Sequence, residues 1–170
     1  MSNDKFHRLI LPLKNKLYRL ALSIVRDRRE AEDIVQDVFL KLWSKKDEWE
    51  EIENIEAYCF RSTKNLALDR IASIEIRKTE SISPELQANF FIDTETPFGQ
   101  ITEQEQINYI NKCIEELSEN QKMVFQLREV EGMSYKEISE SLDISEDLVK
   151  VSLFRARNKI KNFLSEYYKR

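Results

Sequence analysis

Residues that break helices are scarce along this chain. Only two glycines and three prolines occur among its 170 residues, whereas Asp, Glu, Lys and Arg make up 34%. Glycine and proline cost a helix interior about 1 and 3 kcal/mol relative to alanine, so their scarcity permits long helices. Apolar residues on both sides of a central segment recur three and four positions apart, which is the spacing of one helix face. We therefore predict an all-α protein.

The range 79–104 differs from the blocks on either side of it. It contains five acidic residues and no Lys or Arg, and it holds Pro84, Pro97 and Gly99 without a sustained helical repeat. These properties are typical of a linker. We expect two small helical domains, at residues 1–78 and 105–170, joined by a flexible acidic linker at 79–104.

The composition offers little for catalysis or metal binding. His7 is the one histidine, and Cys59 and Cys113 lie in apolar helical patterns, which favours reduced core thiols. Gly99 and Gly132 stand alone, so the chain has no glycine-rich phosphate loop. We expect no enzymatic activity, no cofactor and no small-molecule substrate. No segment resembles a membrane span or a signal peptide, so we expect a cytoplasmic protein without membrane insertion.

The first block contains a helix, from about Glu30 to Trp43, with an unusual polar face. An apolar stripe marks its core side. The opposite face is formed by Asp33, Gln36, Asp37 and Leu40. A single exposed leucine needs no explanation, but a leucine among carboxylates also suits docking to a basic surface on a partner protein. The pattern leaves both interpretations open.

The next helix is predicted over 55–78 and carries aromatic and basic residues on one face. Its buried side is expected to hold Cys59, Phe60, Thr63, Ala67, Ile71 and Ile74. The other face holds Tyr58, Arg61, Lys64, Asn65 and Leu68. Such a face can stack on unpaired bases and follow a phosphate backbone. A solvated basic face is the alternative interpretation.

Serine marks the helix starts of the second block. Ser118 with Gln121, and Ser134 with Glu137, have the spacing of a capping box. These serines predict helices over about 119–129 and 134–142. Ser145 can cap a longer final helix that reaches about Leu164.

The last two helices have the pattern of a helix-turn-helix, with a turn at 143–145. The exposed face of the final helix is expected to present Lys150, Val151, Phe154, Arg155, Arg157 and Asn158. Arg can bond guanine with two hydrogen bonds, Asn can pair with adenine, and Val or Phe can contact a thymine methyl. An ordinary helical hairpin is the alternative, but exposed Val151 and Phe154 favour contact with DNA.

Together these features resemble the extracytoplasmic-function group of the sigma-70 family, the smallest bacterial sigma factors. The resemblance rests on AEDIVQDVFLKLW at 31–43, on NIEAYCFRSTKNLALDR at 54–70 and on residues 117–164. It implies a region 2 helical bundle at 1–78 and a region 4 helix-turn-helix at 105–170.

The resemblance implies an alternative sigma factor that binds core RNA polymerase, directs it to promoters and helps open DNA. The face with Leu40 would dock on the clamp helices of the largest polymerase subunit. The helix at 55–78 would bind the minus-10 element, and the final helix would enter the minus-35 major groove. The resemblance also implies control by an anti-sigma factor and a linker that runs toward the RNA exit channel.

The chain departs from the family pattern at three places. Ser118 stands where proline is common, and Asp143 occupies a turn position often filled by glycine. Val151 and Ser152 stand where Ser-Arg is frequent. The base preference of the final helix therefore cannot be transferred from relatives.

Two other functions compete with this interpretation. A helix-turn-helix regulator with an N-terminal dimerisation domain would bind palindromic DNA without polymerase. A net charge of −4 and the docking face argue against it, because a chain without a positive field binds DNA weakly by itself. A helical anti-sigma or adaptor protein would bind protein only. Such a protein has no use for a face with Phe154, Arg155 and Asn158.

Overall fold

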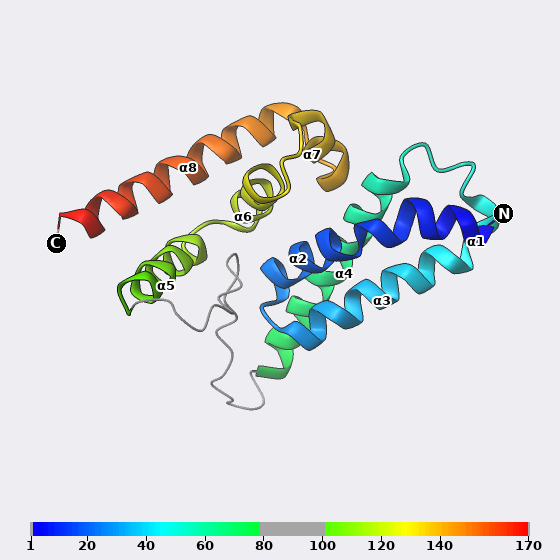
Figure 1. The fold of residues 1–170 in the computed structure, drawn as a ribbon, viewed down its shortest axis with the longest axis horizontal. Helices are drawn as coiled ribbons and strands as arrows, with labels where there is room; N and C mark the ends of the chain where they lie inside the picture. Colours follow the sequence, from blue (N-terminus) through cyan, green and yellow to red (C-terminus); the bar gives the residue numbers. More distant parts are fainter. Residues whose placement is uncertain (1, 79–100, 170) are drawn as a thin grey trace. The chain divides into compact units, whose positions relative to one another are not determined.

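The computed structural model describes residues 2–78 and 101–169. Every regular element within these two ranges is helical, as the scarcity of glycine and proline predicts (Figure 1). The chain divides into two compact units, and each is described by itself. Most of the predicted linker at 79–104 lies outside the described residues, and helix α5 (Ile101–Glu115) begins within that range.

In the first unit, α2 (Lys14–Val25), α3 (Arg28–Ser44) and α4 (Ile55–Lys78) each pack against the other two (Figure 1). The short helical segments α1 (Ser2–Lys5), η1 (Phe6–Ile10) and η2 (Leu11–Leu13) precede α2. The core draws on all three long helices. Its fully buried members include Leu17, Leu20, Ala21, Ala31, Ile34, Val38, Leu42, Phe60 and Ala67.

The corner between α2 and α3 is built by two residues of opposite backbone geometry. Arg26 adopts the left-handed conformation, with φ of 58°, and its backbone N–H donates to the carbonyl of Leu22 at 2.9 Å. Asp27 is extended, and its carboxylate accepts from the backbone N–H groups of Arg29 at 2.8 Å and Glu30 at 3.2 Å. These bonds satisfy donors that a helix start leaves without a partner. They set where α3 begins.

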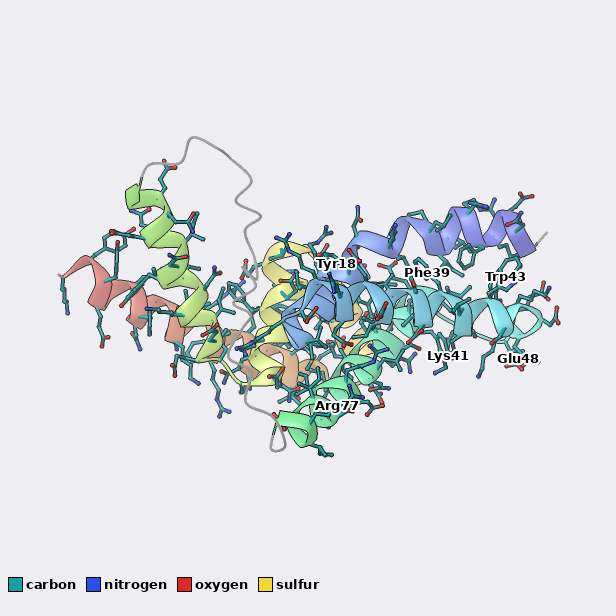
Figure 2. The ribbon with its side chains drawn as sticks, turned by 90° about the horizontal axis from the view of Figure 1, so that it is seen from below. Tyr18, Phe39, Lys41, Trp43, Glu48 and Arg77 are labelled. Carbon is teal, nitrogen blue, oxygen red and sulfur yellow. The ribbon has the colours of Figure 1, made fainter. Side chains whose placement is uncertain are left out.

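An aromatic cluster lies at the other end of α3. Trp49 is buried, and its indole N–H donates to the carbonyl of Leu42 at 2.8 Å. The ring centroid of Phe6 lies 5.6 Å from those of both Phe39 and Trp43. Figure 2 shows Phe39 and Trp43 on the side of α3 nearer the N-terminal segment. Phe39 is half-buried at the edge of this cluster.

In the second unit, α8 (Glu146–Tyr168) packs against both α5 and α6 (Glu119–Phe125). The short helix α7 (Tyr135–Leu142) lies between α6 and α8 in sequence. A buried cluster unites Ile114, Leu117 and Ala156. Three half-buried residues pack against it: Ile110, Phe125 and Ile160. One side of α8 therefore belongs to the core of this unit.

The helix starts predicted from serine are confirmed. Ser118 and Gln121 form a reciprocal capping box, and so do Ser134 and Glu137. The hydroxyl of Ser145 accepts from the backbone N–H of Leu148 at 3.1 Å, which opens α8. The turn before α8 contains Asp143 in the left-handed conformation, with φ of 56°. Glycine adopts this conformation without strain, which accounts for its frequency at such a turn position.

Two helices end differently from the prediction. The helix expected to reach Glu129 is α-helical only to Phe125 and continues as a wider π-helical turn, η4 (Gln126–Val130). The final helix passes Leu164 and ends at Tyr168.

An aromatic contact with α5 accounts for the longer final helix. The ring centroid of Tyr109 lies 4.6 Å from that of Phe163 and 4.4 Å from that of Tyr167. The Tyr109 hydroxyl also donates to the carbonyl of Phe163 at 3.1 Å. Contacts of this kind stabilise helical turns that periodicity alone leaves undecided.

Replacing Asp27 by alanine removes both capping bonds at the start of α3. We expect Asp27→Ala to lower the free energy of unfolding of the first unit by about 0.5–2 kcal/mol. Both tryptophans of the chain, Trp43 and Trp49, lie in this unit, so a urea titration followed by tryptophan fluorescence reports its unfolding. Asp47→Ala, at an exposed aspartate of η3 (Lys46–Glu48), is the control. An equal loss in both variants would contradict the capping role.

Candidate protein and nucleic-acid interfaces

The polar face of α3 is displayed on the surface of the first unit. Asp33, Gln36, Asp37 and Leu40 are all exposed, and Leu40 retains 67% of its accessible surface. The opposite side of α3 is buried through Ala31, Ile34, Val35, Val38 and Leu42. An exposed apolar side chain among carboxylates is suited to a partner that offers both an apolar contact and positive charge.

Arg70 of α4 joins this face, although sequence analysis gave it no role. Its Nη2 donates to Oδ2 of Asp37 at 3.0 Å, and its Nη1 donates to Glu30. The hydrogen bond to Glu30 raises the pKa of Arg70, and the charges of Glu30, Asp37 and Asp33 act in the same direction. Glu30 and Asp37 are seven residues apart and lie on the same side of α3, but this spacing does not identify a partner on another helix.

The helix α4 has the boundaries predicted from sequence, and one of its sides is buried. Cys59, Phe60, Thr63 and Ala67 have no exposed surface, whereas Ile71 and Ile74 are half-buried. The predicted nucleic-acid face consists of exposed Asn65 and half-buried Tyr58, Arg61, Lys64 and Leu68. The Nε of Arg61 donates to the carbonyl of Ala57 at 3.5 Å, so this guanidinium is tied to the preceding helical turn.

The predicted DNA-binding face of α8 is exposed throughout. Its residues are Lys150, Val151, Phe154, Arg155, Arg157 and Asn158. Phe154 retains 66% of its accessible surface and Val151 retains 42%. Leu148, also exposed, extends this face by one turn and was not named from the sequence. Its spacing of three residues from Val151 and seven from Arg155 is the pattern that could have identified it.

Arg157 differs from the other residues of this face. Its Nε donates to Oε1 of Glu129 in η4 at 2.8 Å. This ion pair draws the guanidinium of Arg157 toward η4, at the flank of the α8 face. Arg155 has no such partner among the described residues.

Profiles of known families match both units of the chain. The profile of Sigma-70 region 2 matches residues 9–75, which include α2, α3 and most of α4. The profile of Sigma-70, region 4 matches residues 107–160, which include α6, η4, α7 and the first part of α8.

The chain belongs to the sigma-70 family.

It is an alternative sigma factor, which directs RNA polymerase to promoters, and the family regulates transcription. It is 25% identical over 173 residues to the extracytoplasmic-function (ECF) RNA polymerase sigma factor SigW of Bacillus subtilis, a match that covers 97% of this chain and 91% of the relative. It is 28% identical over 163 residues to the ECF RNA polymerase sigma-E factor of Haemophilus influenzae, covering 92% and 86%.

Two solved structures share the fold of this sigma factor. The sigma factor RpoE, in complex with the anti-sigma factor NepR from Bartonella quintana, matches with a TM-score of 0.71 at 24% identity, over 95% of this chain and 98% of that chain. CnrH, in complex with the cytosolic domain of CnrY, matches with a TM-score of 0.67 at 20% identity, over 96% and 90%. These likenesses support the all-α fold.

Other chemistry-bearing residues are accounted for by the fold. Within the described ranges no three His, Cys, Asp or Glu residues are grouped so as to hold a metal ion. No helix in those ranges has the length and apolar character needed to cross a membrane. Cys59 and Cys113 are buried and unpaired in disulfides, as predicted. Burial, with Glu56 nearby, raises the pKa of Cys59 to about 12, and burial, with Glu116, raises that of Cys113 to about 11.

We expect both thiols of the native sigma factor to resist 5,5′-dithiobis(2-nitrobenzoate) at pH 8, because the thiolate is the nucleophile and both pKa values lie well above pH 8. Unfolding in urea should release two reactive thiols per chain. The pKa of each thiol is higher in the folded protein than the ordinary value of 9.0. Burial of the protonated thiols therefore contributes fully to the free energy of unfolding below pH 9, and this contribution is lost as the pH rises toward 12. Rapid reaction of the native protein would contradict the buried placement.

Proposed function

We propose that this sigma factor acts through three separate surfaces, one on each of α3, α4 and α8. The α3 face of Asp33, Gln36, Asp37 and Leu40 docks on the clamp helices of the largest subunit of core RNA polymerase. The α4 face binds the minus-10 element, and the α8 face reads the minus-35 element. The observation that carries this proposal is the exposure of a large apolar residue on two of these faces: Leu40 on α3 and Phe154 on α8.

The α3 face is suited to a protein partner rather than to DNA. Its carboxylates would repel phosphates, but they complement a basic protein surface and steer its approach. Leu40 can supply the apolar contact that fixes the complex once charges have brought the partners together. Core polymerase would therefore be held by a small patch of four exposed residues.

The α4 face combines groups that suit single-stranded DNA. Tyr58 offers a ring for stacking on an unpaired base, and Arg61 and Lys64 offer positive charge to the backbone. Asn65 adds an amide that can bond a base edge. The Arg61 guanidinium is tied to the carbonyl of Ala57, so it would lose less freedom when it contacts DNA.

The α8 face suits the major groove of the minus-35 element. Arg155 and Asn158 can bond base edges, and Val151 and Phe154 can contact thymine methyl groups. Lys150 can hold a phosphate, which fixes position without reading sequence. Arg157, paired with Glu129, stands at the flank and suits a backbone contact.

The two units would act together because one chain joins them. We assign region 2 to residues 1–78, the linker to 79–104 and region 4 to 105–170. Tethering converts the second binding event into an intramolecular one, so modest affinities of the separate units combine on one promoter. The acidic linker would run toward the RNA exit channel, where its charge resembles that of RNA.

The same surfaces offer a means of control. The RpoE and CnrH structures each contain a bound partner, the anti-sigma factor NepR and the cytosolic domain of CnrY respectively. We infer that an anti-sigma factor also occludes the surfaces of this chain. The sigma factor would act in the cytoplasm with RNA polymerase, which performs the chemistry, and would contribute no catalytic group itself.

The docking face can be tested by reversing its character. We expect Leu40→Glu combined with Asp37→Lys to abolish binding to core polymerase in a pull-down, and to abolish transcription from a cognate promoter. Far-UV circular dichroism should show an unchanged helix content, since both side chains are exposed. Ile76→Glu is the matched control, because Ile76 on α4 is 69% exposed, as Leu40 is 67% exposed. Retained binding by the double variant would refute the docking face.

Base reading by α8 can be separated from phosphate contact. We expect Arg155→Ala to weaken binding of the reconstituted holoenzyme to its promoter by about 1–3 kcal/mol and to relax the preference at one minus-35 position. Lys150→Ala should weaken binding to all templates equally and reduce its salt dependence. Binding to templates with single minus-35 substitutions measures both effects. An unchanged base preference in Arg155→Ala would overturn the assignment.

A further inference from the structure

Arg70 connects the docking face of α3 to the nucleic-acid helix α4. Glu30 and Asp37 stand seven residues apart on α3, a rise of about 10 Å, and the Arg70 guanidinium reaches both with different nitrogens. The two long helices are therefore joined by a forked ion pair in addition to their apolar packing. Side chains of Arg70 and Glu30 are each 31% exposed, so the network lies at the rim of the core rather than within it.

The geometry at Asp37 leaves part of the carboxylate available. Arg70 bonds Oδ2, and Oδ1 makes no hydrogen bond within residues 2–78. The Asp37 side chain remains 49% exposed. A carboxylate can accept at both oxygens, so Asp37 can bond Arg70 and a cation of a partner at the same time.

The stabilising effect of such a network is small. Exposed ion pairs gain little in water, because solvent screens the charges and the side chains lose freedom in forming them. A gain in folding stability alone therefore does not account for Arg70 at this position. A side chain already held in one conformation, however, loses less freedom when a partner binds.

We propose that Arg70 is a positioning residue for polymerase binding: it holds the Asp37 carboxylate in the conformation that core polymerase engages. This inference rests on the docking function proposed for α3. The ion pairs of Arg70 hold the Asp37 carboxylate of this face against α4. Asp33, Gln36 and Leu40 complete the face, and none of them bonds Arg70.

Removal of Arg70 has two opposing effects on the docking face. The face becomes more acidic, which speeds association with a basic surface. Asp37 also becomes mobile, and its mobility shortens the life of the complex. A positioning role predicts that the second effect dominates, so the loss lies in the dissociation rate.

The test uses the full-length sigma factor and purified core RNA polymerase, with association and dissociation followed by biolayer interferometry. We expect Arg70→Ala to raise the Kd about three- to tenfold, mainly through faster dissociation. The matched control is Arg77→Ala, an exposed arginine seven residues further along the same helix (Figure 2), which should leave the Kd unchanged. An unchanged or lower Kd for Arg70→Ala would overturn the proposal.

A double-mutant cycle with Asp37→Asn distinguishes positioning from a general structural effect. Arg70→Ala should have almost no further effect on the Kd in the Asp37→Asn background, because the carboxylate to be positioned is absent. An equal effect in both backgrounds would overturn the proposal, since Arg70 would then act independently of Asp37. Tryptophan fluorescence in urea should show nearly the same unfolding midpoint for all variants.

Two further variants complete the design. Arg70→Lys keeps the charge but cannot reproduce the fork, so it should give an intermediate Kd, and it substitutes for Arg70→Ala if that variant fails to fold. Leu40→Glu, measured in parallel, tests the docking face itself. If Leu40→Glu binds core normally, the face and the positioning role both fail. If Leu40→Glu fails to bind and Arg70→Ala binds normally, only the positioning role is wrong.

Discussion

The surface that region 2 exposes depends on the burial of α2 against both α3 and α4. Leu17, Leu20 and Ala21 lose all of their accessible surface in this contact. Apolar burial is strong but has no direction, so it does not by itself decide which residues of α3 remain outside. The left-handed turn at Arg26 and the cap at Asp27 set the residue at which α3 begins. They therefore determine which residues of α3 remain exposed. The surface that we propose for docking on polymerase is the side of α3 that this packing leaves uncovered.

Region 4 obeys a similar constraint within one helix. Val149, Leu153 and Ala156 of α8 are buried, while Val151, Phe154 and Arg155 are exposed between them. Buried and exposed positions of α8 therefore lie less than one helical turn apart. Under the proposed reading of the minus-35 element by α8, changes in promoter preference would arise at the exposed positions, while the buried positions keep their packing.

Local features of the sequence predicted most of the fold, and contacts between distant segments account for the rest. The boundaries of α4, the three serine caps and the exposure of Leu40 and Phe154 follow from spacing within one helix. The ion pairs of Arg70, and the contact of Tyr109 with Phe163, join residues that lie far apart in the chain. Periodicity assigns each of these residues to a helix face but does not name its partner. For this reason Arg70 was missed at the candidate site, whereas its neighbour Asp37 was found.

The length of α8 has a mechanical consequence. The helix runs unbroken from Glu146 to Tyr168, about 34 Å, and its last turns are held to α5 by the ring and hydroxyl of Tyr109. A continuous helix resists twisting, so its first turns cannot rotate in a DNA groove without moving the distant end. In the proposed complex region 4 would enter the groove with α8 held against α5, so Tyr109 would influence the angle of α8 from a position outside its proposed DNA-binding face.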